Sequence, residues 1–451
     1  VPVYLEVARK LVQAAHPEEN PLVVDPFSGG GSIPLEALRL GCETFASDLN
    51  PVACLILKMM LEEIPRDGPE LSDKLLKIGN EIKAAAKIQL SDLYPTDPDG
   101  ATPIAYLWAR TVRCESPNCG AEIPLLSSLW LCKKNNRRWA LRPNVIRSMD
   151  QYPKVNFEIF KPLSNNEVAS GTVTRAKASC LCCGTVMPPQ RLRAQLTEQN
   201  GGADVVFDTE GLRVGGALMT AVVTIRPYEQ GRHYRMPIDA DYTTVYMAQE
   251  RLANIQEEWE SKGQNTLCPI PEEPLPLMSG TFNVPLYGMN TWGDLFTARQ
   301  KVALVVLGQL TASAEMKKLP LALVLSRTAN ASCSLCRWHT SGEKHEGVFS
   351  RQALPMVWDY SESNPLSNST GGYAGALNWI TKVIKAWPKS ETGQVQSANA
   401  TDHPLPDKSA GVWFTDPPYY FAVPYADLSD FFFVWLKRTL PDHPLIRDPF
   451  D

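Results

Sequence analysis

The sequence predicts an α/β protein with a Rossmann-like core that is interrupted by a zinc-ribbon insertion. Two observations predict the core: a glycine-rich turn follows an apolar strand near the start of the chain, and an Asp-Pro-Pro-Tyr motif follows another apolar strand near its end. A third observation predicts the insertion, because cysteines, tryptophans and arginines become frequent from about residue 102. The 451 residues are enough for two or three such units.

Strands and helices alternate through the first hundred residues. The hydrophobic pattern predicts, in order, strand 22–25, helix 33–40, strand 42–48 and helices over 51–64 and 71–90. Ser32 is expected to cap the first helix, because its hydroxyl can accept from a free N–H group. Gly41 is expected to end that helix, and Asn50-Pro51 opens the next one.

The middle of the chain is predicted to be a separate module. Strand-like runs replace long helices between about 102 and 280, and a proline-rich hinge at 269–276 leads back to the main fold. We therefore predict a core made of residues 1–101 and 281–451. The insertion would comprise residues 102–280.

The last third of the chain returns to the core pattern. A helical pattern begins at Trp292, whereas 361–375 and 389–409 are predicted to be loops. Residues 412–415 form an apolar strand that leads directly into Asp416.

The first candidate site is the turn after strand 22–25, which runs Asp25-Pro26-Phe27-Ser28-Gly29-Gly30-Gly31. Glycines let the backbone approach a bound nucleoside, and an acid about twenty residues later, here Asp48, suits ribose hydroxyls. The spacing is not Gly-x-Gly-x-x-Gly, which disfavours NAD, and a mere tight turn is the alternative. The loop is predicted to bind S-adenosylmethionine through Asp25, Pro26, Phe27, Ser28, Gly29, Gly31, Asp48 and Asn50.

The second candidate site is the catalytic motif Asp416-Pro417-Pro418-Tyr419. An exocyclic amine is a poor nucleophile, because its lone pair is delocalised into the ring. The Asp416 carboxylate can accept one N–H of the amine, and the Pro417 carbonyl can accept the other. These two hydrogen bonds favour the geometry that the nitrogen needs for attack on a methyl group. The two prolines hold the carbonyl in place. Tyr419 would stack on the extruded base. An ordinary turn is the alternative for the tetrapeptide alone.

The third candidate site is a pair of cysteine hairpins. Cys114-x4-Cys119 and Cys180-x2-Cys183 are each followed by glycine, as a tetrahedral structural zinc site requires. Cys182 is an alternative ligand within the second hairpin. A further stretch, Cys333-x2-Cys336 with His339 and His345, has no second hairpin to complete a site, so buried reduced cysteines are the preferred interpretation there.

Charge is distributed unevenly along the chain. The net charge is −5, yet residues 101–200 carry +8 and the remainder carries −13. This asymmetry suggests that the insertion faces a polyanion, and a solvated basic face is the alternative. Its predicted nucleic-acid-binding residues are Lys133, Lys134, Arg137 and Arg138.

The sequence predicts a cytoplasmic protein. No apolar run reaches the roughly 18 residues of a membrane span, so no membrane partner is expected. Residues 1–10 lack the basic start and cleavage site of a signal peptide. The 11 cysteines are odd in number, which argues against a disulfide framework.

These motifs resemble the prokaryotic adenine-specific DNA methylases that contain a zinc ribbon. The resemblance covers most of the chain and rests on the blocks 25–51, 287–300, 337–365 and 416–431. It implies an amino-methyltransferase fold that modifies adenine N6 in DNA, with the insertion, 102–280, in the position of a target-recognition domain. It also implies a restriction–modification or anti-phage defence system, with other subunits as partners. A complete methyltransferase sheet continues well beyond this motif, so we expect the core to lack its C-terminal strands.

Three functions remain open from the sequence. The leading one is transfer of a methyl group from S-adenosylmethionine to adenine N6 in DNA. The second is the same chemistry on an RNA base, and the third is a catalytically idle DNA-binding subunit of a defence complex. Cytosine-C5 chemistry is disfavoured, because no Pro-Cys nucleophile is present in the catalytic loop.

Overall fold

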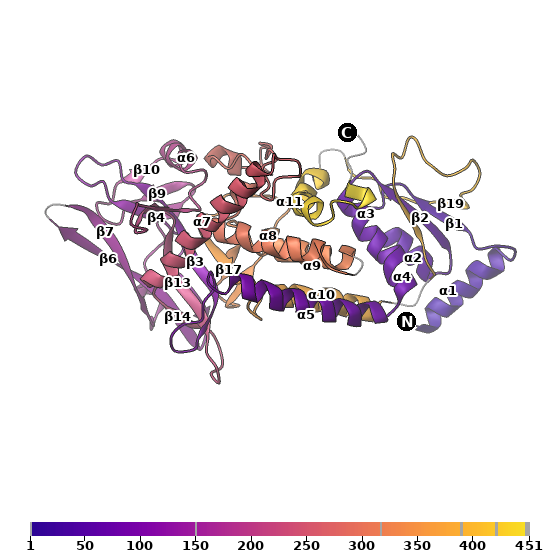
Figure 1. The fold of residues 1–451 in the computed structure, drawn as a ribbon, viewed down its shortest axis with the longest axis horizontal. Helices are drawn as coiled ribbons and strands as arrows, with labels where there is room; N and C mark the ends of the chain where they lie inside the picture. Colours follow the sequence, from indigo (N-terminus) through magenta and orange to yellow (C-terminus); the bar gives the residue numbers. More distant parts are fainter. Residues whose placement is uncertain (1, 149–150, 316–317, 388–390, 420–422, 447–451) are drawn as a thin grey trace. The chain divides into compact units, whose positions relative to one another are not determined.

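The computed structural model describes residues 2–148, 151–315, 318–387, 391–419 and 423–446, and the fold is mixed α/β with several sheets (Figure 1). The chain divides into two compact units. Unit 1 comprises Val1–Ile82, Thr311–Ser326 and Leu377–Asp451, and unit 2 comprises Lys83–Leu310 and Arg327–Ala376. Within the described ranges, no helix is both long and apolar enough to cross a membrane.

Unit 1 is built on a four-stranded parallel sheet. Its strands are β1 (Leu22–Asp25), β2 (Glu43–Asp48), β18 (Gln394–Ser397) and β19 (Val412–Trp413). They lie in the order β18-β2-β1-β19, so the first two strands of the chain are central and the last two flank them. Because all four strands are parallel, the loops after them leave from the same edge of the sheet.

Helices of unit 1 pack on this sheet through a small apolar core. The cluster Leu38, Ala46, Leu57 and Leu61 joins α2 (Ser32–Arg39), α3 (Pro51–Leu57) and the π-helical turn η1 (Lys58–Glu63) to β2. The other helices that lie in this unit, wholly or in part, are α1 (Pro2–Ala15), α4 (Ile64–Asp67), α5 (Glu70–Leu90), α8 (Ala298–Ala312), α9 (Lys318–Ala329), α10 (Tyr373–Ala386), α11 (Tyr425–Thr439) and η5 (Pro444–Ile446).

Unit 2 is organised around β3 (Thr102–Arg113), a long strand that is buried along almost its whole length. It pairs antiparallel with β13 (Leu218–Ile225), β17 (Asp359–Ser363) and β4 (Glu122–Leu125), and β14 (His233–Arg235) extends the sheet beyond β13. Since β17 follows the predicted insertion in the chain, unit 2 extends beyond residues 102–280.

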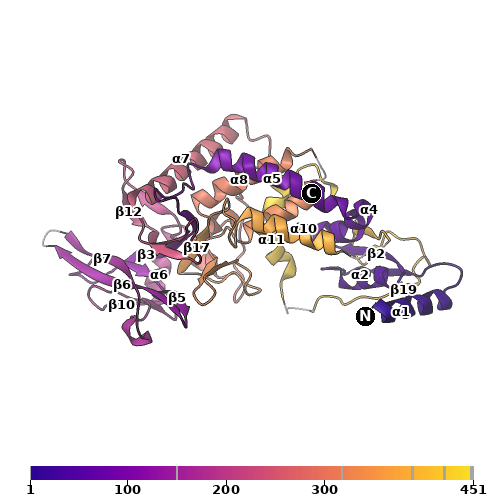
Figure 2. The same cartoon turned by 90° about the horizontal axis from the view of Figure 1, so that it is seen from below.

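A second sheet of unit 2 contains a long two-stranded ribbon, β6 (Arg137–Ser148) and β7 (Gln151–Phe160), with β5 (Trp130–Lys134) beside β6 (Figures 1 and 2). The remaining strands are β8 (Val173–Thr174), β9 (Lys177–Ser179), β10 (Val186–Met187), β11 (Val205–Phe207), β12 (Arg213–Gly216), β15 (Arg337–His339) and β16 (Lys344–Glu346). The helices α6 (Pro189–Thr197) and α7 (Asp239–Ser261) complete the unit, with 3-10 turns η2 (Asn165–Glu167), η3 (Val284–Tyr287) and η4 (Trp292–Leu295).

Several local predictions were wrong. Ser32 is the first helical residue and not the cap, because Gly31 precedes the helix in the left-handed conformation at φ 79°. The predicted loop 389–409 contains β18, and 361–375 contains the end of β17. The expected absence of long helices from 102–280 is contradicted by the 23-residue α7.

Candidate active site and metal centre

The glycine loop after β1 is tied to the end of β2 by the carboxylate of Asp48. The N–H of Gly29 donates to Asp48 Oδ2 at 2.9 Å, and the N–H of Asn50 donates to Asp48 Oδ1 at 2.9 Å. Gly29 has φ 48°, and a Cβ built there would meet no atom within 4 Å, so the loop borders open space. Gly31 has φ 79°, a conformation that other residues rarely adopt, and a Cβ there would lie 2.7 Å from Leu57 Cδ2.

Asp25 is buried beneath this loop, with 1% of its surface exposed. Its Oδ1 accepts from the N–H of Phe27 at 3.2 Å. Burial raises the pKa of the Asp25 carboxyl, and the hydrogen bond from the Phe27 N–H opposes that rise.

The Asp-Pro-Pro-Tyr motif leaves the sheet beside the glycine loop. Phe414 donates its N–H to the carbonyl of Val24 in β1 at 3.1 Å, which sets the direction of the segment that follows. Asp416, Pro417 and Pro418 are exposed, and Tyr419 is 74% exposed. The glycine loop, Asp48 and the Asp-Pro-Pro-Tyr motif therefore lie at the same edge of one sheet.

Asn50 connects the end of β2, where Asp48 holds the glycine loop, to α11, which follows the Asp-Pro-Pro-Tyr motif. Its Oδ1 accepts from the N–H of Val52 at 2.9 Å and so caps α3, while its Nδ2 donates to Ser429 Oγ on α11 at 2.9 Å. His403 packs edge-on against both Phe45 and Trp413, with ring centroids 5.1 Å apart in each case. Sequence reasoning assigned no role to Ser429, which lies in the block 416–431, or to His403, because both contacts are long-range.

The paired cysteine hairpins converge in unit 2. The Sγ atoms of Cys114, Cys119, Cys180 and Cys183 all lie within 4.8 Å of one another, with the closest pairs at 3.6 and 3.7 Å. Three of the four residues are buried and Cys183 is exposed. This arrangement could hold a metal ion such as zinc, for which four thiolates are a common ligand set. Cys182 is not part of the cluster.

Local backbone geometry explains why each hairpin ends in glycine. Gly120 has φ 60° and Gly184 has φ 78°, a region that other residues rarely adopt. Hydrogen bonds from Thr185 lower the pKa of the exposed Cys183 thiol to about 6, whereas burial raises that of Cys114 to about 12. A bound cation would favour the thiolate form at all four positions.

The second cysteine stretch forms no such cluster in the described part of the chain. Cys333 Sγ donates to the carbonyl of Leu295 at 3.4 Å, and His345 Nδ1 lies 3.0 Å from Ser361 Oγ. His339 Nδ1 accepts from the N–H of Gly342 at 2.9 Å. Cys336 Sγ donates to the carbonyl of Asn330 at 3.5 Å, and the described residues bring no three of these four side chains together as metal ligands.

The four basic residues singled out in the sequence are partly engaged within unit 2. Lys134 Nζ lies 2.7 Å and Arg137 Nη1 3.9 Å from the buried carboxylate of Glu343. Arg138 donates to the carbonyl of Leu163 at 3.0 Å, and Lys133 Nζ lies 5.2 Å from the centre of the Trp130 ring. Their role in binding nucleic acid stays a prediction.

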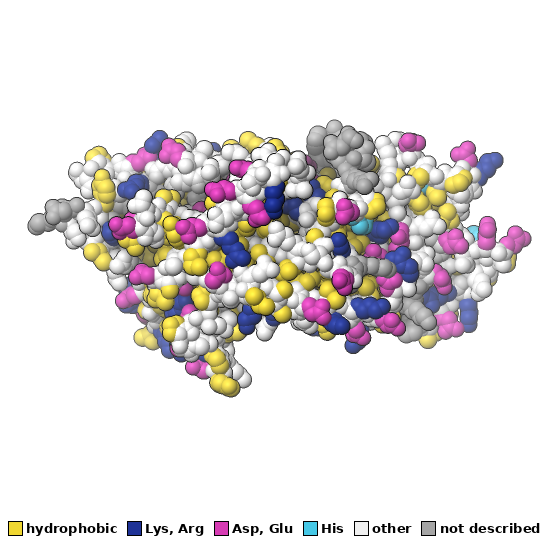
Figure 3. All heavy atoms as spheres, viewed as in Figure 1, with side chains coloured by type: hydrophobic (Ala, Val, Ile, Leu, Met, Phe, Trp, Pro, Cys, Tyr) yellow, Lys and Arg dark blue, Asp and Glu magenta, His cyan; other side chains and the backbone are white. Residues whose placement is uncertain are grey.

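Basic and acidic side chains are interspersed on the face of the molecule that Figure 3 shows.

Comparison of the chain with family models, with curated proteins and with solved structures found no significant match.

Proposed function

We propose that this chain is a methyltransferase that uses S-adenosylmethionine and methylates the exocyclic amino group of adenine, N6, in DNA. The observation that carries the proposal is the arrangement of unit 1. The glycine loop, Asp48 and the Asp-Pro-Pro-Tyr motif follow the first, second and fourth strands of a parallel sheet, at one edge.

The order of these strands supports a nucleotide-binding sheet. Numbered along the chain, the strands lie in the order third, second, first, fourth. Doubly wound sheets begin with this order and bind their ligands outside the carboxyl ends of the strands. The proposed Rossmann-like core rests on this topology.

The residues of the loop fit the nucleoside part of S-adenosylmethionine. Each carboxylate oxygen of Asp48 accepts one backbone N–H and keeps a lone pair for a ribose hydroxyl. The open space beside Gly29 and the 40% exposed ring of Phe27 leave room for an adenosyl group. When bound, the cofactor supplies an electrophilic methyl group.

The Asp-Pro-Pro-Tyr motif would prepare the target amine. Asp416 accepts one N–H of the amine, and the backbone carbonyl of Pro417 accepts the other, so the nitrogen lone pair is released for attack. Pro418 limits the freedom of that carbonyl. Tyr419, which is 74% exposed, is available to stack on an extruded base.

The chemistry is tested with full-length protein and labelled S-adenosylmethionine, offered duplex DNA, single-stranded DNA and RNA in parallel. Asp416→Ala should lower methyl transfer about a hundredfold or more, because one oriented polar contact in the site is lost. Cofactor binding should be nearly unchanged. Asp407→Ala is the control, since Asp407 is also exposed in the chain just before β19.

The outcomes separate the three functions. Label in adenine of DNA supports the proposal, and label in RNA alone supports an RNA amino-methyltransferase instead. Protein that binds cofactor and DNA but transfers no label, with candidate partner subunits present, would be an idle subunit.

A further inference from the structure

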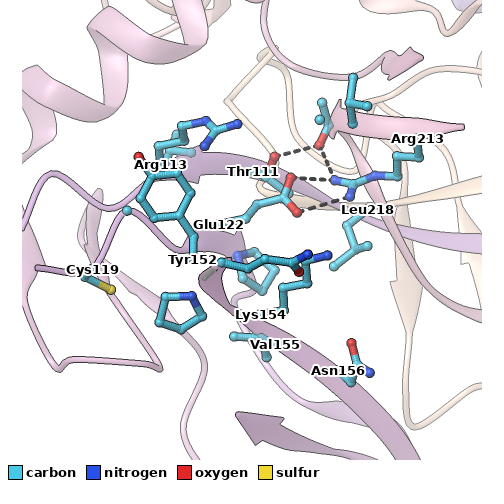
Figure 4. A pocket seen from close by; sticks show the side chains of 18 of the residues that line it. Thr111, Arg113, Cys119, Glu122, Tyr152, Lys154, Val155, Asn156, Arg213 and Leu218 are labelled. Atoms are coloured by element: carbon cyan, nitrogen blue, oxygen red, sulfur yellow. Dashed lines mark hydrogen bonds and ion pairs between the residues drawn. The ribbon is translucent and has the colours of Figure 1, made fainter. Parts of the chain in front are cut away.

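A groove of about 1440 Å³ lies beside the cysteine cluster in unit 2 (Figure 4). Its walls come from the end of β3, the first cysteine hairpin, the β6–β7 ribbon and β12. The volume exceeds the roughly 300–1,000 Å³ that a drug-sized ligand needs, so the groove suits an extended ligand. None of the four basic residues predicted from the sequence lines it.

Positive charge dominates this groove. Among the described residues, four cationic side chains line it, Arg113, Arg147, Lys154 and Arg213, and one carboxylate does, that of Glu122. Arg213 neutralises that carboxylate, with Nη2 2.6 Å from Oε1 and Nη1 3.1 Å from Oε2 (Figure 4). Among the described residues, none forms an ion pair with the other three cations. The described lining of the groove therefore carries three positive charges that no described carboxylate pairs with, which makes it complementary to a polyanion.

An aromatic ring is held among these cations. Tyr152 is 65% exposed, yet a Cβ added to Gly120 would lie 2.5 Å from its ring, so the ring packs directly on the backbone of the first cysteine hairpin. The Arg113 guanidinium lies 6.0 Å from the ring centre (Figure 4). A ring already held in place loses little conformational entropy when a flat ligand stacks on it.

We propose that this groove binds a single strand of nucleic acid, with Arg113, Arg147 and Lys154 on phosphates and Tyr152 on a base. Aromatic rings beside a cationic groove are how proteins bind unpaired strands, since every base has a π face. A duplex keeps its bases stacked inside, so Tyr152 would find no base there. The identity of the polyanion rests on the proposed function, because a base methyltransferase must hold the strand that carries its target.

The test uses the full chain and labelled strands of about 20 nucleotides, longer than the roughly 4–16 that a single-strand site covers. DNA and RNA strands of one sequence and the matching DNA duplex are titrated over a range of salt concentrations. The triple variant Arg113→Gln/Arg147→Gln/Lys154→Gln should weaken single-strand binding at least tenfold. The slope of log affinity against log salt concentration should become shallower by about 2, because each of the three lost phosphate contacts contributes about 0.7. The DNA and RNA titrations distinguish which strand the groove prefers.

Single variants keep the test interpretable. Tyr152→Ala should weaken binding about 5- to 100-fold, and Tyr152→Phe should bind within about twofold of the wild type. Arg147 also donates to the Cys182 carbonyl at 2.7 Å, so its replacement removes a structural hydrogen bond as well as a charge. Lys154→Gln removes no ion pair or hydrogen bond of the described structure. It therefore measures the effect of the charge alone and should weaken binding a few-fold. Arg142→Gln is the matched control, because Arg142 is exposed on the same ribbon but pairs with Glu158 at 2.7 Å.

Wild-type affinity and salt slope in the triple variant would overturn the groove proposal, as would wild-type protein that binds only the duplex. Methyl transfer is measured separately on the same samples. If the groove variants lose strand binding but no protein sample transfers methyl groups, the groove stands and the methyltransferase proposal fails. If methyl transfer proceeds and the variants bind like the wild type, only the groove proposal fails.

Discussion

Among the described residues of unit 2, Arg299 and Glu362 form the most completely buried ion pair, each with 1% of its side chain exposed. Arg299 Nε lies 2.7 Å from Glu362 Oε1, and its guanidinium lies 4.0 Å from the centre of the Tyr106 ring. Trp108 Nε1 also donates to Glu362 Oε2 at 2.8 Å. Such a pair tolerates loss of one member poorly, because the remaining charge is left buried and unpaired.

Arg299→Met should therefore lower the free energy of unfolding by about 3–5 kcal/mol, measured by urea denaturation. The control is Arg191→Met, which removes an exposed arginine that binds Glu115 at 2.7 Å. That change should have little effect, because water screens an exposed pair. Equal losses in both variants would show that burial does not set the cost.

Asp359 gives unit 2 a dependence on pH. Burial raises the pKa of its carboxyl to about 6, although hydrogen bonds from the Ser127 N–H and hydroxyl oppose the rise. The usual pKa of this carboxyl is 3.8, so between pH 3.8 and about pH 6 the folded chain holds a proton that the unfolded chain has lost. The stability that the protonated Asp359 contributes is therefore fully present below about pH 3.8 and is lost as the pH rises through about 6.

Asp359→Asn should stabilise the protein by about 1–2 kcal/mol above pH 6.5, because the replacement cannot ionise and still accepts from Ser127. The difference from the wild type should disappear near pH 4. Urea denaturation at both pH values measures it. A difference that is the same at both pH values would mean that ionisation of Asp359 is not its source.

At the scale of elements, the two cysteine hairpins are the main feature of unit 2 that was predictable from sequence. Spacing and the following glycines identified both hairpins but left the choice between Cys182 and its neighbours open. The structure decides for Cys180 and Cys183, because their Sγ atoms, and not that of Cys182, belong to the cluster with Cys114 and Cys119.

Cys183→Ser should abolish stoichiometric zinc binding, measured by elemental analysis of purified protein, because a four-sulfur site loses one ligand. Cys182→Ser is the matched control and should keep its zinc. The Cys183→Ser protein should also be digested faster within unit 2, while binding S-adenosylmethionine normally, since structural zinc supplies folding energy locally. Zinc retained in Cys183→Ser but lost in Cys182→Ser would reverse the ligand assignment.

Two elements escaped sequence analysis for a physical reason. β18 contains a single apolar residue, Val395, because it lies at the edge of the unit 1 sheet and has little surface to bury. α7 is predominantly polar, with only four of its 23 residues buried. Hydrophobic periodicity detects buried faces, so elements with little buried surface give weak patterns.

At the scale of the whole molecule, the candidate sites are divided between the units. The glycine loop, Asp48 and the Asp-Pro-Pro-Tyr motif belong to unit 1, whereas the cysteine cluster and the cationic groove belong to unit 2. The chain passes between the units four times, at positions within α5, α8, α9 and α10. The linear division into 1–101, 102–280 and 281–451 therefore does not describe the compact units.

The sequence by itself determined the local features. Strand β1, the capped start of α3, the long helix α5 and the two cysteine hairpins follow from short patterns, because each depends on neighbouring residues or on fixed spacing. Only the tertiary structure decided which distant segments pair. β17 joins the sheet of β3 and β18 joins that of β2, and the cations of the groove come together from separate strands. Such pairings depend on packing and hydrogen bonds between residues far apart in the chain, which no local pattern records.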